Sequence, residues 1–409
     1  MRILIAGENA SARKGGEAIL PLIYAAKMQA RGHDIVLVTH ARNRTEIEAD
    51  FPALAPFTHY IADALSHRVL WALGERFPEA LRDRAFGNMI ALLTAWDMRQ
   101  IVRRLIARQS FDLVHQPIPV SPATPSPLYG LGVPVVIGPM NGGMSYPPGF
   151  AAREGRAARA FLRLGRMTAR LANRLWPGKA QAARLLIAND RTRRALPVTH
   201  ASILTMPENG VDLAIWTAPP PHAGPGLRKG FRLVFMGRLI GLKGLDLTLQ
   251  AIEIARARKP GLNITLDILG DGPERAMIEA RGLPGVYLHG FLTQAECAAR
   301  LTGADALILN SLRECGGAII LEAMALGVPV IASDWGGPAD YVTPETGILV
   351  PPAPADSFAD RLADAILQMA ENPDAARRMG QAGLARVREK FDWQQRICDM
   401  EEIYRSVAR

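Results

Sequence analysis

Short apolar runs alternate with helical stretches along the chain. Each run is long enough for one strand, and the stretches between them carry apolar residues at helical spacing. Apolar runs separated by helices are typical of a parallel, doubly wound sheet covered on both faces. The strands predicted in the first half are Ile3–Ala6, Ile35–Thr39, Phe111–His115, Val133–Ile137, Leu185–Ala188 and Ile203–Thr205.

The alternation stops at residues 213–230, LAIWTAPPPHAGPGLRKG, which are rich in Pro and Gly and have no periodicity. We interpret this segment as a linker. The sequence therefore predicts an α/β protein with domains at residues 1–212 and 231–390, and a C-terminal helix at 391–409 that packs back on the first domain. Strands predicted after the linker are Arg232–Met236, Ile264–Leu269, Val286–Leu288, Ala306–Leu309 and Val328–Ile331.

Composition agrees with a two-domain globular protein. A chain of 409 residues is too long for one hydrophobic core, and its 49% hydrophobic and 21% charged content is that of a soluble protein. Cys297, Cys315 and Cys398 lack zinc-like spacing and cannot all pair, which favours a reducing cytoplasm. The N-terminus reads as a strand and a polar loop rather than a signal peptide, and no apolar run is long enough to span a bilayer.

The charge is concentrated in the first half. Residues 1–200 hold 27 Lys and Arg against 14 Asp and Glu, whereas residues 201–409 hold 21 against 25. The segment 151–174 places Arg residues three and four apart beside apolar ones, a basic amphipathic pattern that can lie on anionic lipid at the inner face of the cytoplasmic membrane. An ordinary surface helix remains the alternative. Nucleic acid is disfavoured, because this segment offers Phe161 as its single aromatic residue.

The stretch Ser311–Ser333, SLRECGGAIILEAMALGVPVIAS, reads as loop, helix, turn and buried strand. Gly316 and Gly317 stand where the helix begins, and a helix N-terminus offers free N–H groups and a positive dipole end to an anion. Glu314 and Glu322 bracket this helix start. Such a stretch fits a phosphate site, and it also fits an ordinary turn between a helix and a strand.

Two further loops follow predicted strands of the second half. Gly237-Arg238 and then Lys243 place two cations beside a glycine, where they could hold a diphosphate from two sides or form a solvated basic loop. Gly270 and Asp271 open a tight turn that could be purely structural. Together with the helix start, these loops predict a site for a ligand that carries phosphates and hydroxyl groups, since carboxylates accept hydrogen bonds from hydroxyls.

The first half offers weaker signals. Gly15 and Gly16 lie between the first strand and its helix, where a glycine pair lets backbone amides approach a ligand. His115 ends a strand and precedes a proline-rich loop, so it could be catalytic or a buried structural histidine. A second such loop, GPMNGGMSYPPGF, follows the strand at Val133–Ile137.

The order of these motifs resembles the retaining GT-B glycosyltransferases of family 4. The pattern Glu314-x7-Glu322 within ECGGAIILEAMALGVPV is similar to that family's signature, and the resemblance also covers Gly15-Gly16, GPxxGG at 138–143, NGVD at 209–212, and GDGPE. It implies two Rossmann-like, doubly wound parallel-sheet domains that face each other across a cleft. The family often shows His-x-His where this chain has His115 followed by Pro117.

The resemblance assigns roles to matching positions. It implies that Arg238 and Lys243 neutralise the donor diphosphate, that the amides of Gly316 and Gly317 cradle it, and that Gly16 lets the N-terminal loop close over it. It further implies that Glu322 binds the ribose, Glu314 holds the transferred sugar, His115 belongs to the catalytic group, and Gly15, Gly237, Gly270 and Asp271 contribute to nucleotide binding.

The resulting hypothesis is a retaining hexosyltransferase that uses a UDP- or GDP-linked sugar. Its acceptor is a carbohydrate or a polyprenyl-diphosphate-linked oligosaccharide, as in bacterial exopolysaccharide or cell-surface glycan synthesis. The chain has no D-x-D motif, so neither a metal nor another cofactor is expected. The alternatives are a sugar-nucleotide epimerase of the same fold and a non-catalytic nucleotide-sugar or membrane-binding subunit.

Overall fold

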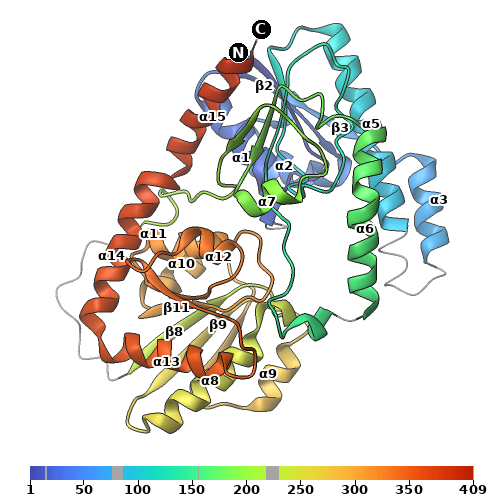
Figure 1. Cartoon of the computed structure of the whole chain (residues 1–409). Helices are drawn as coiled ribbons and strands as arrows, with labels where there is room; N and C mark the ends of the chain where they lie inside the picture. Colours follow the sequence, from blue (N-terminus) through green and yellow to red (C-terminus); the bar gives the residue numbers. More distant parts are fainter. Residues whose placement is uncertain (14–15, 76–85, 155, 218–229, 409) are drawn as a thin grey trace. The chain divides into compact units, whose positions relative to one another are not determined.

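A computed structural model of the chain describes residues 1–13, 16–75, 86–154, 156–217 and 230–408. The chain divides into two compact units (Figure 1). Unit 1 contains Met1–Gly143, Leu162–Glu208 and the residues from Ile397 onward, and unit 2 contains Met144–Phe161 and Asn209–Arg396.

Unit 1 is built on a seven-stranded parallel sheet in the order β3-β2-β1-β4-β5-β6-β7. Its central strands are near-continuous apolar runs because helices cover both faces of the sheet. Ile5 of β1 pairs with Leu37 of β2 on one side and with His115 of β4 on the other. The strands are β1 (Arg2–Ala6), β2 (Asp34–His40), β3 (Thr58–Ile61), β4 (Leu113–Gln116), β5 (Val135–Met140), β6 (Arg184–Ile187) and β7 (Ile203–Thr205).

The helices of unit 1 connect these strands. A polar connection after β1 leads through a short 3-10 turn, Gly16–Ile19, into a largely buried α1. The helices are α1 (Leu20–Ala30), α2 (Arg44–Asp50), α3 (Leu65–Gly74), α5 (Gly87–Arg108), α6 (Arg156–Leu175) and α7 (Asp190–Ala195). The first residues of α6 are grouped with unit 2.

Unit 2 repeats the plan with a six-stranded parallel sheet in the order β10-β9-β8-β11-β12-β13. Alternate residues of β8 serve opposite cores: Leu233 and Phe235 pack with α8 and α13, whereas Val234 and Met236 pack with α11. The strands are β8 (Phe231–Met236), β9 (Ile264–Leu269), β10 (Val286–Gly290), β11 (Ala306–Leu309), β12 (Val330–Ser333) and β13 (Gly347–Val350).

The helices of unit 2 lie on both faces of this sheet. They are α8 (Leu245–Arg258), α9 (Arg275–Arg281), α10 (Gln294–Thr302), α11 (Ala318–Ala325), α12 (Gly337–Tyr341), α13 (Phe358–Glu371) and α14 (Pro373–Lys390), followed by the start of α15 (Trp393–Val407). None of the helices in the described residues is both long and apolar enough to cross a bilayer.

The last helix contributes residues to both units. Trp393–Arg396 are grouped with unit 2, and the residues from Ile397 onward with unit 1. Within unit 1, the buried carboxylate of Glu401 accepts a hydrogen bond from Arg31 at 2.9 Å and lies 3.1 Å from His33 Nε2. The predicted domain boundaries differ from these groupings for 144–161, for 209–212 and for the start of α15. Most of the predicted linker, 218–229, lies outside the described residues.

The predicted α/β class with two doubly wound parallel sheets is confirmed. Two edge strands were not predicted. In β3 only Ile61 is buried, so this strand has no apolar run to reveal it. The strand β13 starts at a glycine and follows a polar turn, and it pairs with β12 alone.

Candidate functional site

In each sheet the chain first adds strands on one side of the first strand and then on its other side. We call the boundary between these two series the reversal point. In unit 2 this point lies between β8 and β11, and in unit 1 between β1 and β4. Connections leave such a pair of strands on opposite sides, so their carboxyl ends open a crevice where α/β proteins bind ligands. The loops after β8, β9 and β11 follow adjacent strands of one sheet, and the structure therefore brings three predicted site loops together.

The loop after β8 carries the two predicted cations. Arg238 is exposed and forms no ion pair with any described residue. Lys243 ends the 3-10 turn Gly241–Lys243, directly before Gly244, whose left-handed conformation (φ 67°) starts α8. Because this turn folds back toward the strand, Lys243 Cε lies close to Gly237.

Lys243 reaches the loop after β11 through an ion pair with Glu314. The two side chains keep 15% and 18% of their surface exposed, so the pair is largely sheltered and yet open to a ligand at one side. Ser311 Oγ donates a weaker hydrogen bond to the same carboxylate at 3.4 Å. A cation and a carboxylate from separate strand ends are thus held together at the crevice.

The turn after β9 packs directly against the loop after β8. A Cβ atom at Gly270 would overlap the carbonyl oxygen of Gly237, which explains the glycine. The Leu239 amide donates to the carbonyl oxygen of Asp271 at 3.0 Å, and the Asp271 carboxylate accepts from the Gly272 amide at 2.7 Å. Gly270 and Asp271 therefore shape and support the cation-bearing loop.

The helix α11 begins at Gly317, whose φ of 106° is a conformation that favours glycine. No side chain caps this end, so its first amides are available to an anion. The loop after β12 closes over it: the Gly337 amide donates to the Glu314 carbonyl at 2.8 Å, and a Cβ atom at Gly337 would overlap the Gly316 carbonyl.

Glu322 lies on the second turn of α11, half-buried against α10. Burial raises the pKa of its carboxyl to about 7, and its charge in turn helps burial to raise the pKa of Cys297. Among the described residues no donor forms a hydrogen bond with the carboxylate of Glu322. A desolvated carboxylate without a partner, next to a crevice, is a common feature of functional sites.

One group that fixes this geometry was not predicted. Asn310, fully buried at the end of β11, donates to the Gly244 carbonyl at 2.7 Å and accepts from Thr248 Oγ1 at 2.6 Å. It therefore ties the start of α8 to the strand that leads to Glu314. The sequence signal that could have identified Asn310 is a polar residue directly after the apolar run ALIL.

In unit 1, the loops after β1 and β4 also meet. Glu17, next to Gly16, accepts a hydrogen bond from the Val120 amide at 2.8 Å. Gly16 has a φ of 56° and open space beside it. Gly15, which was predicted with it, lies outside the described residues.

His115 lies in β4 itself and is completely buried. The Tyr404 hydroxyl donates to its Nδ1 at 2.7 Å, and Nε2 bonds the Gly138 carbonyl at 2.7 Å, so Nε2 carries the proton. Burial lowers the pKa of His115 to about 4, and the ring is neutral. Both nitrogens are engaged within unit 1, and this geometry favours the structural alternative over the catalytic one.

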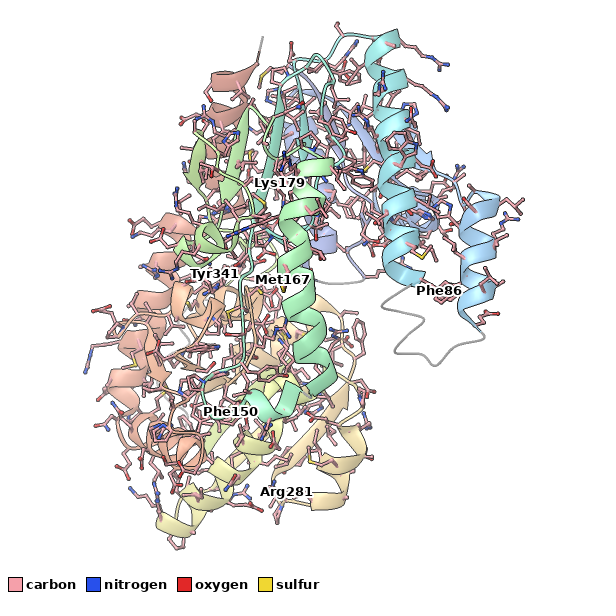
Figure 2. All side chains as sticks on the ribbon, turned by 45° about the vertical axis from the view of Figure 1, so that its right-hand side comes forward. Phe86, Phe150, Met167, Lys179, Arg281 and Tyr341 are labelled. Carbon is pink, nitrogen blue, oxygen red and sulfur yellow. The ribbon has the colours of Figure 1, made fainter. Side chains whose placement is uncertain are left out.

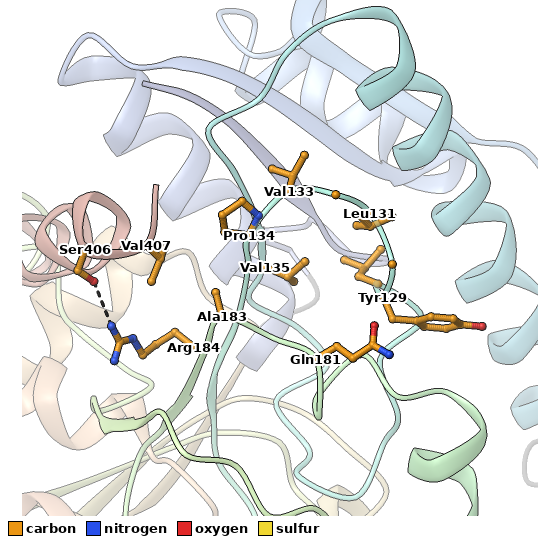
Figure 3. Close-up of a pocket in the computed structure, with 13 residues that line it drawn as sticks. Tyr129, Leu131, Val133, Pro134, Val135, Gln181, Ala183, Arg184, Ser406 and Val407 are labelled. Atoms are coloured by element: carbon orange, nitrogen blue, oxygen red, sulfur yellow. Dashed lines mark hydrogen bonds between the residues drawn. The ribbon is translucent and has the colours of Figure 1, made fainter. Parts of the chain in front are cut away.

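A separate pocket of about 520 Å³ lies at the amino ends of β5 and β6 (Figure 3). Arg184 donates to Ser406 of α15 at 3.3 Å on one side of it. Ligand sites of doubly wound sheets lie at the opposite, carboxyl edge. This pocket is therefore not the site that the three loops form. It is lined by residues 128–135, Gln181, Ala183, Arg184, Ser406 and Val407.

Solved structures resemble the chain over its whole length. Sucrose-phosphate synthase from Thermosynechococcus elongatus is 18% identical, with a TM-score of 0.66 over 99% of this chain and 98% of that one. Anabaena HepE in complex with UDP is 17% identical, with a TM-score of 0.67 over 99% and 100%. The chain has the GT-B fold. The predicted fold class is thereby confirmed.

Sequence similarity to known families and relatives covers part of this GT-B chain. Residues 230–372 match the family model described as glycosyl transferases group 1. A Mycobacterium tuberculosis glycogen synthase is 32% identical over 214 residues, which are 50% of this chain and 49% of that protein. An Arthrobacter D-inositol 3-phosphate glycosyltransferase is 30% identical over 239 residues, 54% and 56%. The chain spans about half the length of the curated relatives it matches.

No group of three or more His, Cys, Asp or Glu side chains within the described part of this GT-B chain is arranged to hold a metal ion.

Proposed function

We propose that the protein is a retaining glycosyltransferase that moves a hexose from a UDP- or GDP-linked sugar to a carbohydrate or polyprenyl-diphosphate-linked acceptor. The observation that carries this proposal is the meeting of Arg238, Lys243, Glu314 and the uncapped start of α11 at the reversal point of the second sheet. The two cations and the free amides can bind a diphosphate. The carboxylates of Glu314 and Glu322 can accept hydrogen bonds from the hydroxyls of its sugars.

In this proposal each group either stabilises charge that develops during transfer or accepts hydrogen bonds from hydroxyl groups of the donor. Breaking the bond between the anomeric carbon and the phosphate oxygen leaves negative charge on the nucleoside diphosphate and a sugar with oxocarbenium character. Arg238, Lys243 and the amides at Gly316 and Gly317 stabilise the leaving diphosphate. Glu322 accepts hydrogen bonds from the ribose hydroxyls, which supplies the partner that its carboxylate lacks.

Glu314 has two tasks in the proposed mechanism. Its ion pair holds Lys243 over Gly237 before the donor arrives, and its remaining acceptor capacity takes sugar hydroxyls. The acceptor hydroxyl attacks from the face that the diphosphate leaves, and its proton passes to the departing phosphate oxygen. Retention follows without an enzymic nucleophile. Arg238 and Lys243 take the part that a metal ion plays in other enzymes, so we propose that the reaction needs no metal.

The names of similar proteins support a nucleotide-sugar donor. The matched relatives include a Corynebacterium glutamicum mannosyltransferase described as GDP-mannose-dependent, which is 28% identical over 203 residues. Anabaena HepE has been solved with UDP-glucose. For the acceptor we propose a lipid-linked glycan of exopolysaccharide or cell-surface synthesis, reached at the cytoplasmic membrane by peripheral contact through the basic first half of the chain.

The helix α6 is one candidate for that contact. It spans Arg156–Leu175, and its second half exposes Met167, Leu171 and Leu175 along one face (Figure 2 labels Met167). The exposed Arg170 and Arg174 lie beside this stripe. The side chains of 156–164 lie outside the described part, so the predicted pattern of the first half stays a prediction.

The proposal is tested by transfer assays with UDP- and GDP-sugars and a panel of glycan and polyprenyl-diphosphate acceptors. Arg238→Ala and Lys243→Ala should each lower kcat roughly 100-fold or more, because each removes charge stabilisation from the leaving group. A chelator should leave the rate unchanged. Arg258→Ala is the matched control, since Arg258 ends α8 at the opposite edge of the sheet and pairs with Asp360 and Asp364. Full activity in both site variants would refute the assignment.

A further inference from the structure

A pair of helices in unit 1 buries polar side chains at its contact and exposes large apolar ones. We call α3 together with the first turns of α5, Gly87–Asp97, the α3–α5 pair. In Figures 1 and 2 α3 lies beside α5 on the side away from the sheet. His67 of α3 and Thr94 of α5 are 3% and 1% exposed and are joined by a hydrogen bond of 3.2 Å between Nε2 and Oγ1. A polar contact is therefore buried between the two helices.

The outer faces of both helices are apolar. Leu65, Val69 and Leu73 recur every four residues on α3 and are 76%, 49% and 42% exposed. On α5, Met89, Leu92 and Trp96 form a second stripe and are 48%, 47% and 44% exposed. Trp71 of α3 is 52% exposed as well. A water-exposed helix normally has the opposite distribution, so these faces indicate an apolar partner.

Exposed arginines lie along both helices, together with the carboxylates of Glu75 and Asp97. Arg68 is exposed between Leu65 and Val69, and Arg103 and Arg104 are exposed farther along α5. At the helical rise of 1.5 Å per residue, Arg103 lies about 10 Å along the axis from Trp96. None of these three arginines forms an ion pair with a residue that the structure describes. Apolar side chains with exposed arginines on the same helices are the combination by which interfacial helices bind anionic lipid.

We propose that the outer face of the α3–α5 pair inserts into the headgroup region of an anionic lipid bilayer. The stripes and the tryptophans enter the acyl boundary, where Trp is favoured because its ring is apolar and its N–H is polar. The arginines bind lipid phosphates. This inference rests on the proposed membrane contact of the first half of the chain but adds a contact separate from α6, and it does not depend on transferase activity.

The charge pattern favours lipid over a second copy of the chain. Unit 1 draws most of its sequence from residues 1–200, which hold 27 basic against 14 acidic residues, so two copies of this cationic surface would repel each other. An anionic bilayer supplies both the apolar phase and the compensating charge. Self-association is therefore an outcome that the test must exclude.

The test measures binding to phosphatidylcholine vesicles with and without phosphatidylglycerol, in the absence of any sugar nucleotide. The wild-type protein should bind the anionic vesicles, and salt should weaken this binding. Val69→Glu and Leu92→Glu should each weaken it at least about tenfold, because each removes an apolar side chain that the bilayer would bury and adds a negative charge. Tyr287→Glu, at a position 53% exposed in unit 2, is the matched control and should bind like wild type.

A parallel variant separates the two candidate contacts. Leu171→Glu alters α6 alone. The proposal is overturned if Val69→Glu and Leu92→Glu bind like wild type while Leu171→Glu does not, or if they abolish self-association measured by light scattering without affecting vesicle binding. Absence of wild-type binding would overturn this inference and the membrane contact together, and would leave the transferase proposal standing.

Insertion depth provides a second measurement. Brominated acyl chains should quench part of the tryptophan fluorescence of the bound wild-type protein. The double variant Trp71→Phe, Trp96→Phe should lose this quenching while the protein remains folded, because both positions are exposed and Phe stays apolar. Equal quenching in this variant would assign the contact to another part of the chain.

Discussion

At the residue scale, Glu322 is the ionisable group of the proposed donor site whose pKa is raised by desolvation. Burial raises the pKa of its carboxyl to about 7 from the ordinary value of 4.5. The charged form is therefore unfavourable in the free protein, and the hydroxyls of a bound ribose would stabilise it. Donor binding and ionisation of Glu322 are consequently linked.

This linkage predicts a pH dependence of donor affinity. Below about pH 7 Glu322 is protonated, and donor binding must remove that proton, so the donor Kd should rise by up to about tenfold per pH unit as the pH falls. Glu322→Gln should bind more weakly at pH 8 and lose the dependence. Calorimetric titration with the donor at a series of pH values measures both; an unchanged pH profile in Glu322→Gln would contradict the ribose role.

The free energy of unfolding of the ligand-free protein should change with pH in the opposite direction to the donor affinity. The unfolded chain ionises Glu322 near 4.5, whereas the folded chain resists ionisation up to about 7. The contribution of Glu322 to the free energy of unfolding therefore falls as the pH rises between these values.

Some site residues were predictable from their local sequence and others were not. Arg238 and Lys243 stand beside glycines directly after an apolar run, which is a local signal. The bond of Lys243 to Glu314 joins positions 71 residues apart, and the bond of Tyr404 to His115 joins positions 289 apart. Such pairings depend on strand order, which a single sequence does not encode in any short stretch.

At the element scale, the carboxyl ends of the strands decide where chemistry can occur. The strands β9 and β11 were predicted with their observed bounds, because each is a short, mostly apolar run with a polar residue or a glycine at its ends. The loop after β12 was missed as part of the site. Its Gly337 contributes through backbone contacts with Glu314 and Gly316, and no pattern of side chains in the sequence predicts such contacts.

The helix α15 provides the test at this scale. Its Tyr404 is fully buried and donates to His115, so Tyr404→Phe leaves Nδ1 of a buried histidine without a partner. This should cost about 1–3 kcal/mol of unfolding free energy. Denaturant unfolding measures the loss, with Ser406→Ala as the control on the exposed side of the same helix. Donor affinity should remain at the wild-type value, and a large loss of turnover in an otherwise stable Tyr404→Phe would instead support a catalytic role for His115.

At the scale of the whole molecule, two sheets with the same central strand order place a reversal point in each unit. Unit 2 has the cations, carboxylates and free helix amides at its reversal point, whereas unit 1 has a buried histidine and a glycine-bordered loop joined through Glu17 and Val120. This asymmetry favours our proposal of a donor site in unit 2 and suggests the further proposal that unit 1 binds the acceptor. It also agrees with the match of residues 230–372 to group 1 glycosyl transferases.

The central claim is that a nucleotide sugar binds at the reversal point of the second sheet, with its diphosphate at the start of α11. Hydrogen exchange measured by mass spectrometry tests it most directly, with and without saturating UDP- or GDP-sugar. The account predicts slower exchange in peptides that cover 237–244 and 314–322, and loss of this protection in Lys243→Ala. Protection at the pocket near Arg184 instead, or no protection with any nucleotide sugar, would contradict it.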